Sequence, residues 1–111
     1  DADCYYGNCV SGWGVLDWGV IGDGSDDPAL ELDDIPGVGP EAISLGSPAS
    51  GAYTIFVHDY PGSVFSGSNP ATFNVWVRGA LLWTDTVDVT TEDAYTALAE
   101  VSFPAGTVVG L

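Results

Sequence analysis

Carboxylates gather between Asp23 and Glu41, where seven of the sixteen acidic residues lie among glycines and prolines. No lysine or arginine falls inside this segment, so the charges repel one another unless a cation binds between them. Ca²⁺ fits such a segment well, because it accepts about six to eight oxygen ligands in flexible geometry. The predicted ligands are Asp33, Asp34 and Glu41, with Asp26 or Asp27 closing the site. A solvated acidic surface is the alternative.

Residues suited to catalysis are few. His58 is the only histidine; it is expected in the middle of a strand, where a lone histidine is more often structural than a general base. The chain has no Gly-x-Ser-x-Gly elbow, and a serine triad needs a nucleophile, a base and an orienting group in one cleft. Paired carboxylates for glycoside hydrolysis are defined by their separation across a cleft, which a count of acids does not reveal. We therefore expect a protein that is not an enzyme.

Two cysteines, Cys4 and Cys9, enclose a Tyr-Tyr-Gly-Asn segment. Its Gly-Asn pair is a turn signal that can bring the two sulfurs together, so a disulfide is predicted. The spacing is not Cys-x-x-Cys, and no further cysteines are available for a structural zinc site. Disulfides persist in oxidising compartments, which indicates an extracellular or cell-surface location. The opening at Asp1 without methionine is expected of a processed or excised chain.

Aromatic residues offer a second kind of binding chemistry. Trp76, Trp83 and Tyr60 are candidates for stacking on sugar rings beside a calcium site, as in a carbohydrate-binding module. Trp76 falls on the polar face of an alternating segment, so its indole is expected at the surface. The alternative places the tryptophans in the core or at a protein interface.

The elements that must position these residues read as strands. Apolar and polar residues alternate along 52–58 and 71–78, which is typical of half-buried strands. Gly79 separates 71–78 from a further extended segment at 81–89, so these two segments are predicted to form an antiparallel hairpin. Shorter strands are expected at 29–32, 41–45 and 106–109.

The segment 91–103 is ambiguous, because Thr91 and the two acids after it could open a helix, while the residues from Tyr95 onwards alternate. A strand is favoured. Short strands punctuated by glycine and proline predict an all-β fold, a single antiparallel β-sandwich over 1–111 of jelly-roll-like or immunoglobulin-like type.

The net charge of the chain limits the classes of partner that it could bind. With sixteen acids against one arginine, the net charge of −15 predicts no nucleic-acid partner and no anionic membrane partner. No apolar run approaches the length of a membrane span, so no membrane insertion is expected. The acidic residues are unevenly distributed along the sequence, since Asp59 is the only one between Ala42 and Thr84. This distribution favours a specific cation site over a generally acidic surface. Adaptation to a saline habitat is an alternative cause of the acidity.

Several motifs together carry a family resemblance. They are the cysteine loop at 4–9, Asp-Trp-Gly at 17–19, the acidic run at 26–34, Gly-Val-Gly-Pro-Glu at 37–41, Gly-Ala-Tyr at 51–53 and Val-His at 57–58. The chain resembles an uncharacterised β-sandwich domain of secreted and surface proteins of Gram-negative bacteria, notably myxobacteria. That domain is similar in style to pre-peptidase C-terminal domains. Such domains are regarded as non-catalytic accessory modules, so the resemblance implies an attachment or structural role.

The N-terminus departs from that family, which places a strand bearing Asp-x-Asp-Leu-His before the cysteine loop. Here only Asp-Ala-Asp precedes Cys4. A sandwich that lacks an N-terminal strand exposes an unpaired edge, which another chain can complete. The resemblance therefore implies self-association, in the form of a fibre built by strand complementation, with copies of the chain or a parent surface protein as partners. The alternative is that residues 13–21 fill the gap.

Overall fold

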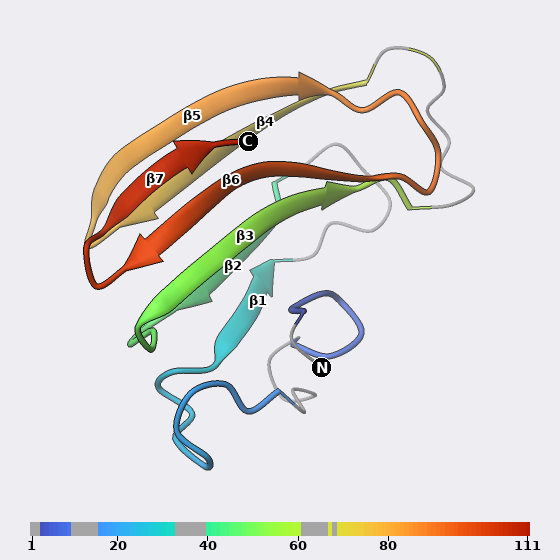
Figure 1. The fold of residues 1–111 in the computed structure, drawn as a ribbon. Coiled ribbons are helices and arrows are strands. Elements are labelled where there is room, and N and C mark those ends of the chain that lie inside the picture. The colour runs from blue at the N-terminus through green and yellow to red at the C-terminus, as the bar shows by residue number, and fades with distance from the viewer. Residues whose placement is uncertain (1–2, 10–15, 33–39, 61–66, 68) are drawn as a thin grey trace. The chain divides into compact units, whose positions relative to one another are not determined.

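The computed structural model describes residues 3–9, 16–32, 40–60, 67 and 69–111. Within these residues the fold is all β, with antiparallel strands arranged in three open sheets (Figure 1). The strands are β1 (Pro28–Leu32), β2 (Ala42–Leu45), β3 (Gly51–His58), β4 (Pro70–Val77), β5 (Ala80–Asp88), β6 (Tyr95–Phe103) and β7 (Thr107–Gly110). The prediction of an all-β antiparallel fold is confirmed, and the architecture is consistent with a small β-sandwich. In the described part of the chain, no helix could span a membrane.

Every expected strand is present, with ends that differ by a few residues. The ambiguous segment after Thr91 becomes a strand only from Tyr95, because Asp93 adopts a positive φ of 62° in the turn before β6. The expectation that His58 lies in mid-strand is wrong, since it is the last residue of β3. Within the described residues 16–21, no strand is formed; residues 13–15 lie outside the described residues.

The chain divides into two compact units, unit 1 (Asp1–Ala49) and unit 2 (Ser50–Leu111). In unit 1, β1 pairs antiparallel with β2, and Leu30 lies opposite Ile43. The Leu30 N–H donates to the Cys9 carbonyl at 2.8 Å, so the N-terminal ring is hydrogen-bonded to β1. Cys9, Pro28 and Leu30 are the buried apolar residues among those described in this unit. The single domain over 1–111 stays a prediction.

Unit 2 contains the three-stranded sheet β3-β6-β7 and the hairpin β4–β5, with β6 between β3 and β7 (Figure 1). Val75 and Trp83 lie opposite each other in the hairpin. The Trp83 ring approaches to 2.5 Å of the place that a Cβ on Gly110 would occupy. A side chain at position 110 would therefore collide with the indole, and the contact joins β5 to β7.

The predicted hairpin is confirmed, and its turn is built by Arg78 and Gly79. Both residues have positive φ, 51° and 79°, as a two-residue type I′ turn requires. The Arg78 guanidinium donates from Nη2 to the Pro104 carbonyl at 2.7 Å, and its Cζ lies 5.0 Å from the Phe103 ring centroid. The single arginine of the chain therefore ties the β4–β5 turn to the β6–β7 turn.

Arg78→Asn is expected to destabilise unit 2 by about 1 kcal/mol, because it removes a charge-assisted hydrogen bond and a cation–π contact that are partly exposed to water. Asparagine tolerates positive φ and suits a type I′ turn, so the loss would report the guanidinium contacts and not the backbone. Urea denaturation of the variant against the wild type measures the difference. Equal or greater stability of the variant would show that these contacts contribute nothing.

Candidate functional site

Carboxylates in the first half of the acidic segment, together with Asp17 before it, accept hydrogen bonds from backbone N–H groups of residues 18–22. The Val20 N–H donates to Asp26 Oδ2 at 2.7 Å, and the Trp18 N–H donates to Asp27 Oδ1 at 2.5 Å. Asp17 accepts from the Gly22 N–H at 3.0 Å. These carboxylates therefore fold the loop by satisfying backbone donors that no strand pairs.

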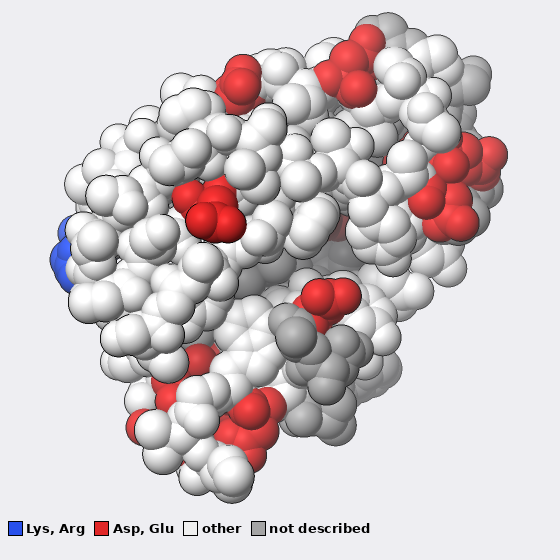
Figure 2. Space-filling model, viewed as in Figure 1, with Lys and Arg blue, Asp and Glu red and all other residues white. Residues whose placement is uncertain are grey.

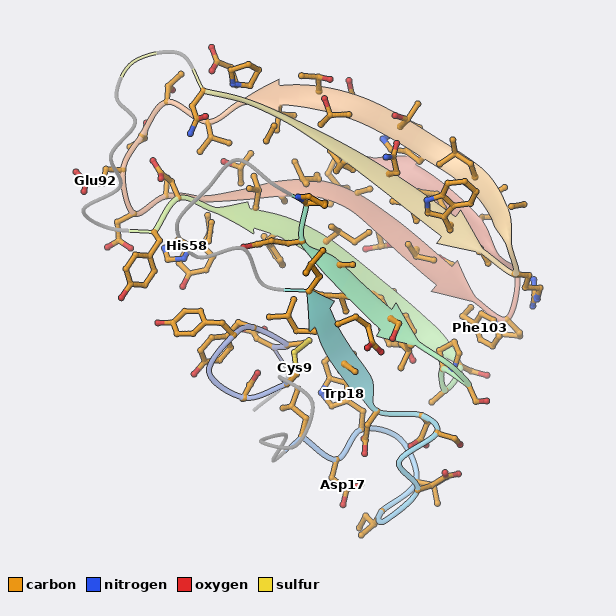
Figure 3. All side chains as sticks on the ribbon, turned by 180° about the vertical axis from the view of Figure 1, so that it is seen from behind. Cys9, Asp17, Trp18, His58, Glu92 and Phe103 are labelled. Atoms are coloured by element: carbon orange, nitrogen blue, oxygen red, sulfur yellow. A yellow bond between two sulfur atoms is a disulfide. The ribbon has the colours of Figure 1, made fainter. Side chains whose placement is uncertain are left out.

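Two of these carboxylates bind the backbone on either side of Gly19. Asp26 and Asp27 bind the residues that flank Gly19, which has a positive φ of 64°. A Cβ at Gly19 would overlap Asp26 Oδ2. Glycine is required here both by the backbone conformation and by the close approach of the carboxylate. Figure 3 shows Asp17 and Trp18 on this loop.

Asp23 holds a tighter local turn. Its Oδ1 accepts from both the N–H and the hydroxyl of Ser25, at 3.0 and 2.6 Å. The Ser25 hydroxyl, followed by the Ser25 N–H, lowers the pKa of Asp23 below its ordinary value of 3.8. Because the folded pKa lies below the unfolded one, the stabilisation is present above the unfolded pKa and is lost as pH falls through the folded pKa.

The structure brings together only part of the predicted calcium site. Asp26 and Asp27 lie side by side on the loop, Glu41 is exposed just before β2, and Asp33 and Asp34 lie outside the described residues. Among the described residues, no three acidic, histidine or cysteine side chains converge in a way that could hold a metal. Asp26 is nevertheless only 5% exposed, and no pattern in the sequence predicts this burial.

The disulfide prediction is confirmed. Cys4 and Cys9 are joined, with their Cα atoms 5.4 Å apart, and the bond is visible beside Cys9 in Figure 3. Asn8 is buried inside the ring, where its Oδ1 accepts from the Tyr5 N–H at 2.9 Å and its Nδ2 donates to the Asp3 carbonyl at 2.6 Å. The ring is therefore closed by a disulfide and held by the hydrogen bonds of Asn8.

His58 is held in a structural arrangement at the end of β3. Its Nε2 lies 2.9 Å from Asp93 Oδ1, and its ring stacks on Tyr95 with centroids 4.0 Å apart and planes 6° apart. The backbone of Asp59 bonds to Asp93 and Ala94 beside it. These contacts close the turn before β6.

The outer face of the β4–β5 hairpin carries the exposed aromatic residue that the sequence predicted. Trp76 is 63% exposed and lies opposite Leu81. Along the same face Asn74 lies opposite Thr84. The hydroxyls of Thr72 and Thr86 share a hydrogen bond of 2.8 Å. The middle of this face therefore carries uncharged polar groups, with the Trp76 indole at one end and Asp88, opposite Pro70, at the other.

The three predicted stacking residues are not brought together on this face. Trp83 is half-buried and packs on Gly110, on the side of the hairpin opposite Trp76. Tyr60 is exposed but follows the end of β3. Of the three predicted stacking residues, only Trp76 could therefore contact a ligand bound to this face of the hairpin.

Figure 2 shows acidic residues in red at several places on this face of the molecule, and the one blue group is Arg78, the only lysine or arginine of the sequence. Comparisons of the chain with protein families, with curated proteins and with solved structures find no match.

Proposed function

We propose that this chain is a non-catalytic extracellular module with a structural or adhesive role, which associates with copies of itself by strand addition. The observation that carries the proposal is the outer edge of β2, which has no hydrogen-bonded neighbour among the described residues. The disulfide supports an oxidising location, and the structural roles of His58 and of the loop aspartates support an absence of catalysis.

The geometry of β1 tells which amides lie on that edge. The Leu30 N–H donates to Cys9 and thus points away from β2, so Leu30 and its partner Ile43 form a non-hydrogen-bonded pair. The backbone groups of Ile43 therefore point away from β1, and those of Leu45, two residues further on, do the same. Ile43 and Leu45 present the donors and acceptors that an added strand would use.

The exposed apolar residues of the β1–β2 pair favour the addition of another strand. A two-stranded ribbon is marginally stable alone, and the Ile43 side chain on β2 is 58% exposed. Leu32, at the end of β1, is also exposed. A strand added at β2 would cover apolar surface and satisfy an open edge together.

Charge sets the conditions for association. A subunit with a net charge of −15 repels its copies at low ionic strength. Salt screens this repulsion, since the Debye length falls to about 8 Å at physiological ionic strength. Bound Ca²⁺ would offset two charges per ion. Association is therefore expected to strengthen with added salt and to weaken in chelator.

Ile43→Pro tests the proposal. The N–H of Ile43 points away from β1. Proline at this position would therefore remove the donor for an added strand while leaving the β1–β2 hydrogen bonds in place. Sedimentation velocity is expected to show concentration-dependent oligomers for the wild type and a monomer for this variant. Ile43→Thr is the matched control, because it keeps the N–H and β-branching. It is expected to associate, more weakly than the wild type. A wild type that stays monomeric at high concentration and high salt would contradict the proposal.

A carbohydrate-binding role is the second candidate, favoured by the outer face of β4–β5. Trp76 offers an exposed ring for stacking, and Asn74 and Thr84 offer neutral hydrogen-bonding groups on the same face. A pull-down with insoluble neutral polysaccharides tests it. Retention of the wild type and loss of retention in Trp76→Ala would support the role, and equal retention of both would exclude this face as the sugar site.

A further inference from the structure

Asp26 carries an anomaly in its hydrogen bonding. Its side chain points into the acidic loop, where Oδ2 accepts from the Val20 N–H. Its other oxygen, Oδ1, is buried and has no hydrogen-bond partner among the described residues. Buried polar atoms are almost always bonded, and an exception calls for an explanation, of which a bound water or ion is one.

The cost of this arrangement is large for a charged group. An ionised carboxylate that is 5% exposed loses most of its hydration and needs a compensating charge. Arg78 is the only lysine or arginine in the chain, and its guanidinium is held by Pro104 and Phe103. No lysine or arginine side chain is therefore available to compensate an ionised Asp26, which leaves a bound cation as a source of that charge.

The surrounding atoms select the kind of ion. Asp27 adds a second carboxylate next in the chain, and both groups grip the backbone around Gly19. Neither a thiolate nor an imidazole is at hand, because both cysteines are in the disulfide and the one histidine is bound to Asp93. An all-oxygen set suits a hard cation of flexible coordination, which describes Ca²⁺ better than a transition metal.

We propose that Asp26 Oδ1 is a ligand of a Ca²⁺ ion bound in the 17–27 loop, with Asp27 as the second carboxylate. Backbone carbonyls and water would complete the coordination. This site is smaller than the one predicted from the sequence, because it does not need Asp33, Asp34 or Glu41. It is also independent of self-association, since a monomer could bind the ion.

Thermal melting tests the site in the intact chain, after extraction with EDTA and dialysis. Adding Ca²⁺ to about a hundred times its Kd should raise the Tm of the wild type by on the order of 10 °C. Asp26→Asn should abolish the shift. Asp85→Asn, which removes an equal charge from an exposed residue of β5, should keep it. A wild-type Tm that is unchanged by Ca²⁺ would overturn the proposal. A proton or a water bound to Oδ1 would then be the remaining explanation of its burial.

Terbium luminescence gives a second readout that does not depend on the folding of Asp26→Asn. Tb³⁺ replaces Ca²⁺ at oxygen sites and is excited by a nearby indole, and the Trp18 backbone is bonded to Asp27. Trp18→Phe should lose most of the sensitised emission, while Trp76→Phe should keep it, and Ca²⁺ should quench it by competition. Emission that survives Trp18→Phe but is lost in Trp76→Phe would place the ion elsewhere and overturn the assignment.

Discussion

Trp83→Ala is expected to destabilise unit 2 by about 3 kcal/mol, whereas Trp76→Ala is expected to change its stability by less than about 0.5 kcal/mol. Both residues are tryptophans of the same hairpin, so the pair separates packing from composition. Trp83 packs on Gly110 and lies opposite the buried Val75. Its removal would leave a cavity beside β7, but Trp76 is mostly in solvent already.

Trp83→Phe refines this experiment. The Trp83 Nε1 atom is buried and has no hydrogen-bond partner in the described part of the chain. Phenylalanine keeps an aromatic ring on Gly110 and removes that donor, so its cost should fall well below the cost of alanine. Urea denaturation of the three variants gives the comparison. Equal losses for Trp83→Ala and Trp76→Ala would contradict the account of the two faces.

Replacing Cys4 and Cys9 by serine is expected to cost about 2 kcal/mol, at the low end for a disulfide because the closed loop is short. The loss should remain local to unit 1. Cys9 is 2% exposed and its carbonyl binds the Leu30 N–H, so a loosened ring would release this amide in the middle of β1. The amides of β6 in unit 2 should keep their protection.

Hydrogen exchange of the double serine variant measures this locality. Faster exchange at Leu30 with unchanged exchange in β6 is the expected pattern. Loss of protection throughout unit 2 would show instead that the ring stabilises the whole chain. Asn8→Ala is a useful companion, because it keeps the disulfide and removes the two side-chain hydrogen bonds that Asn8 makes to the backbone of Tyr5 and Asp3.

The strands could be predicted because their information is local. Alternation along β4 placed Phe73, Val75 and Val77 on one face and Trp76 on the other, as the burial confirms. The Arg-Gly turn was recognisable as a break between two extended segments, although its cation–π contact with Phe103 was not. That contact depends on two turns that are far apart in the sequence.

The acidic loop could be predicted only as a concentration of charge. Which oxygens remain for a cation depends on backbone donors, and these are set by turn conformations such as the positive φ of Gly19. From the sequence, Asp26 and Asp27 are interchangeable candidates for closing the site, and the structure distinguishes Asp26 from Asp27 by its burial. The contact of Trp83 with Gly110 presents the same difficulty, because β5 and β7 are far apart in the sequence.

Hydrogen exchange at the β2 edge tests self-association most directly. The amides of Ile43 and Leu45 point away from β1, so they should exchange rapidly in dilute protein at low salt. As concentration and salt rise, both should become protected together, while the exchange of Ser44, which faces β1, stays constant. Coincident protection of Ile43 and Leu45 with growth in mass would support strand addition between copies. Exchange at these two amides that is the same at every concentration, whether fast or slow, would contradict it.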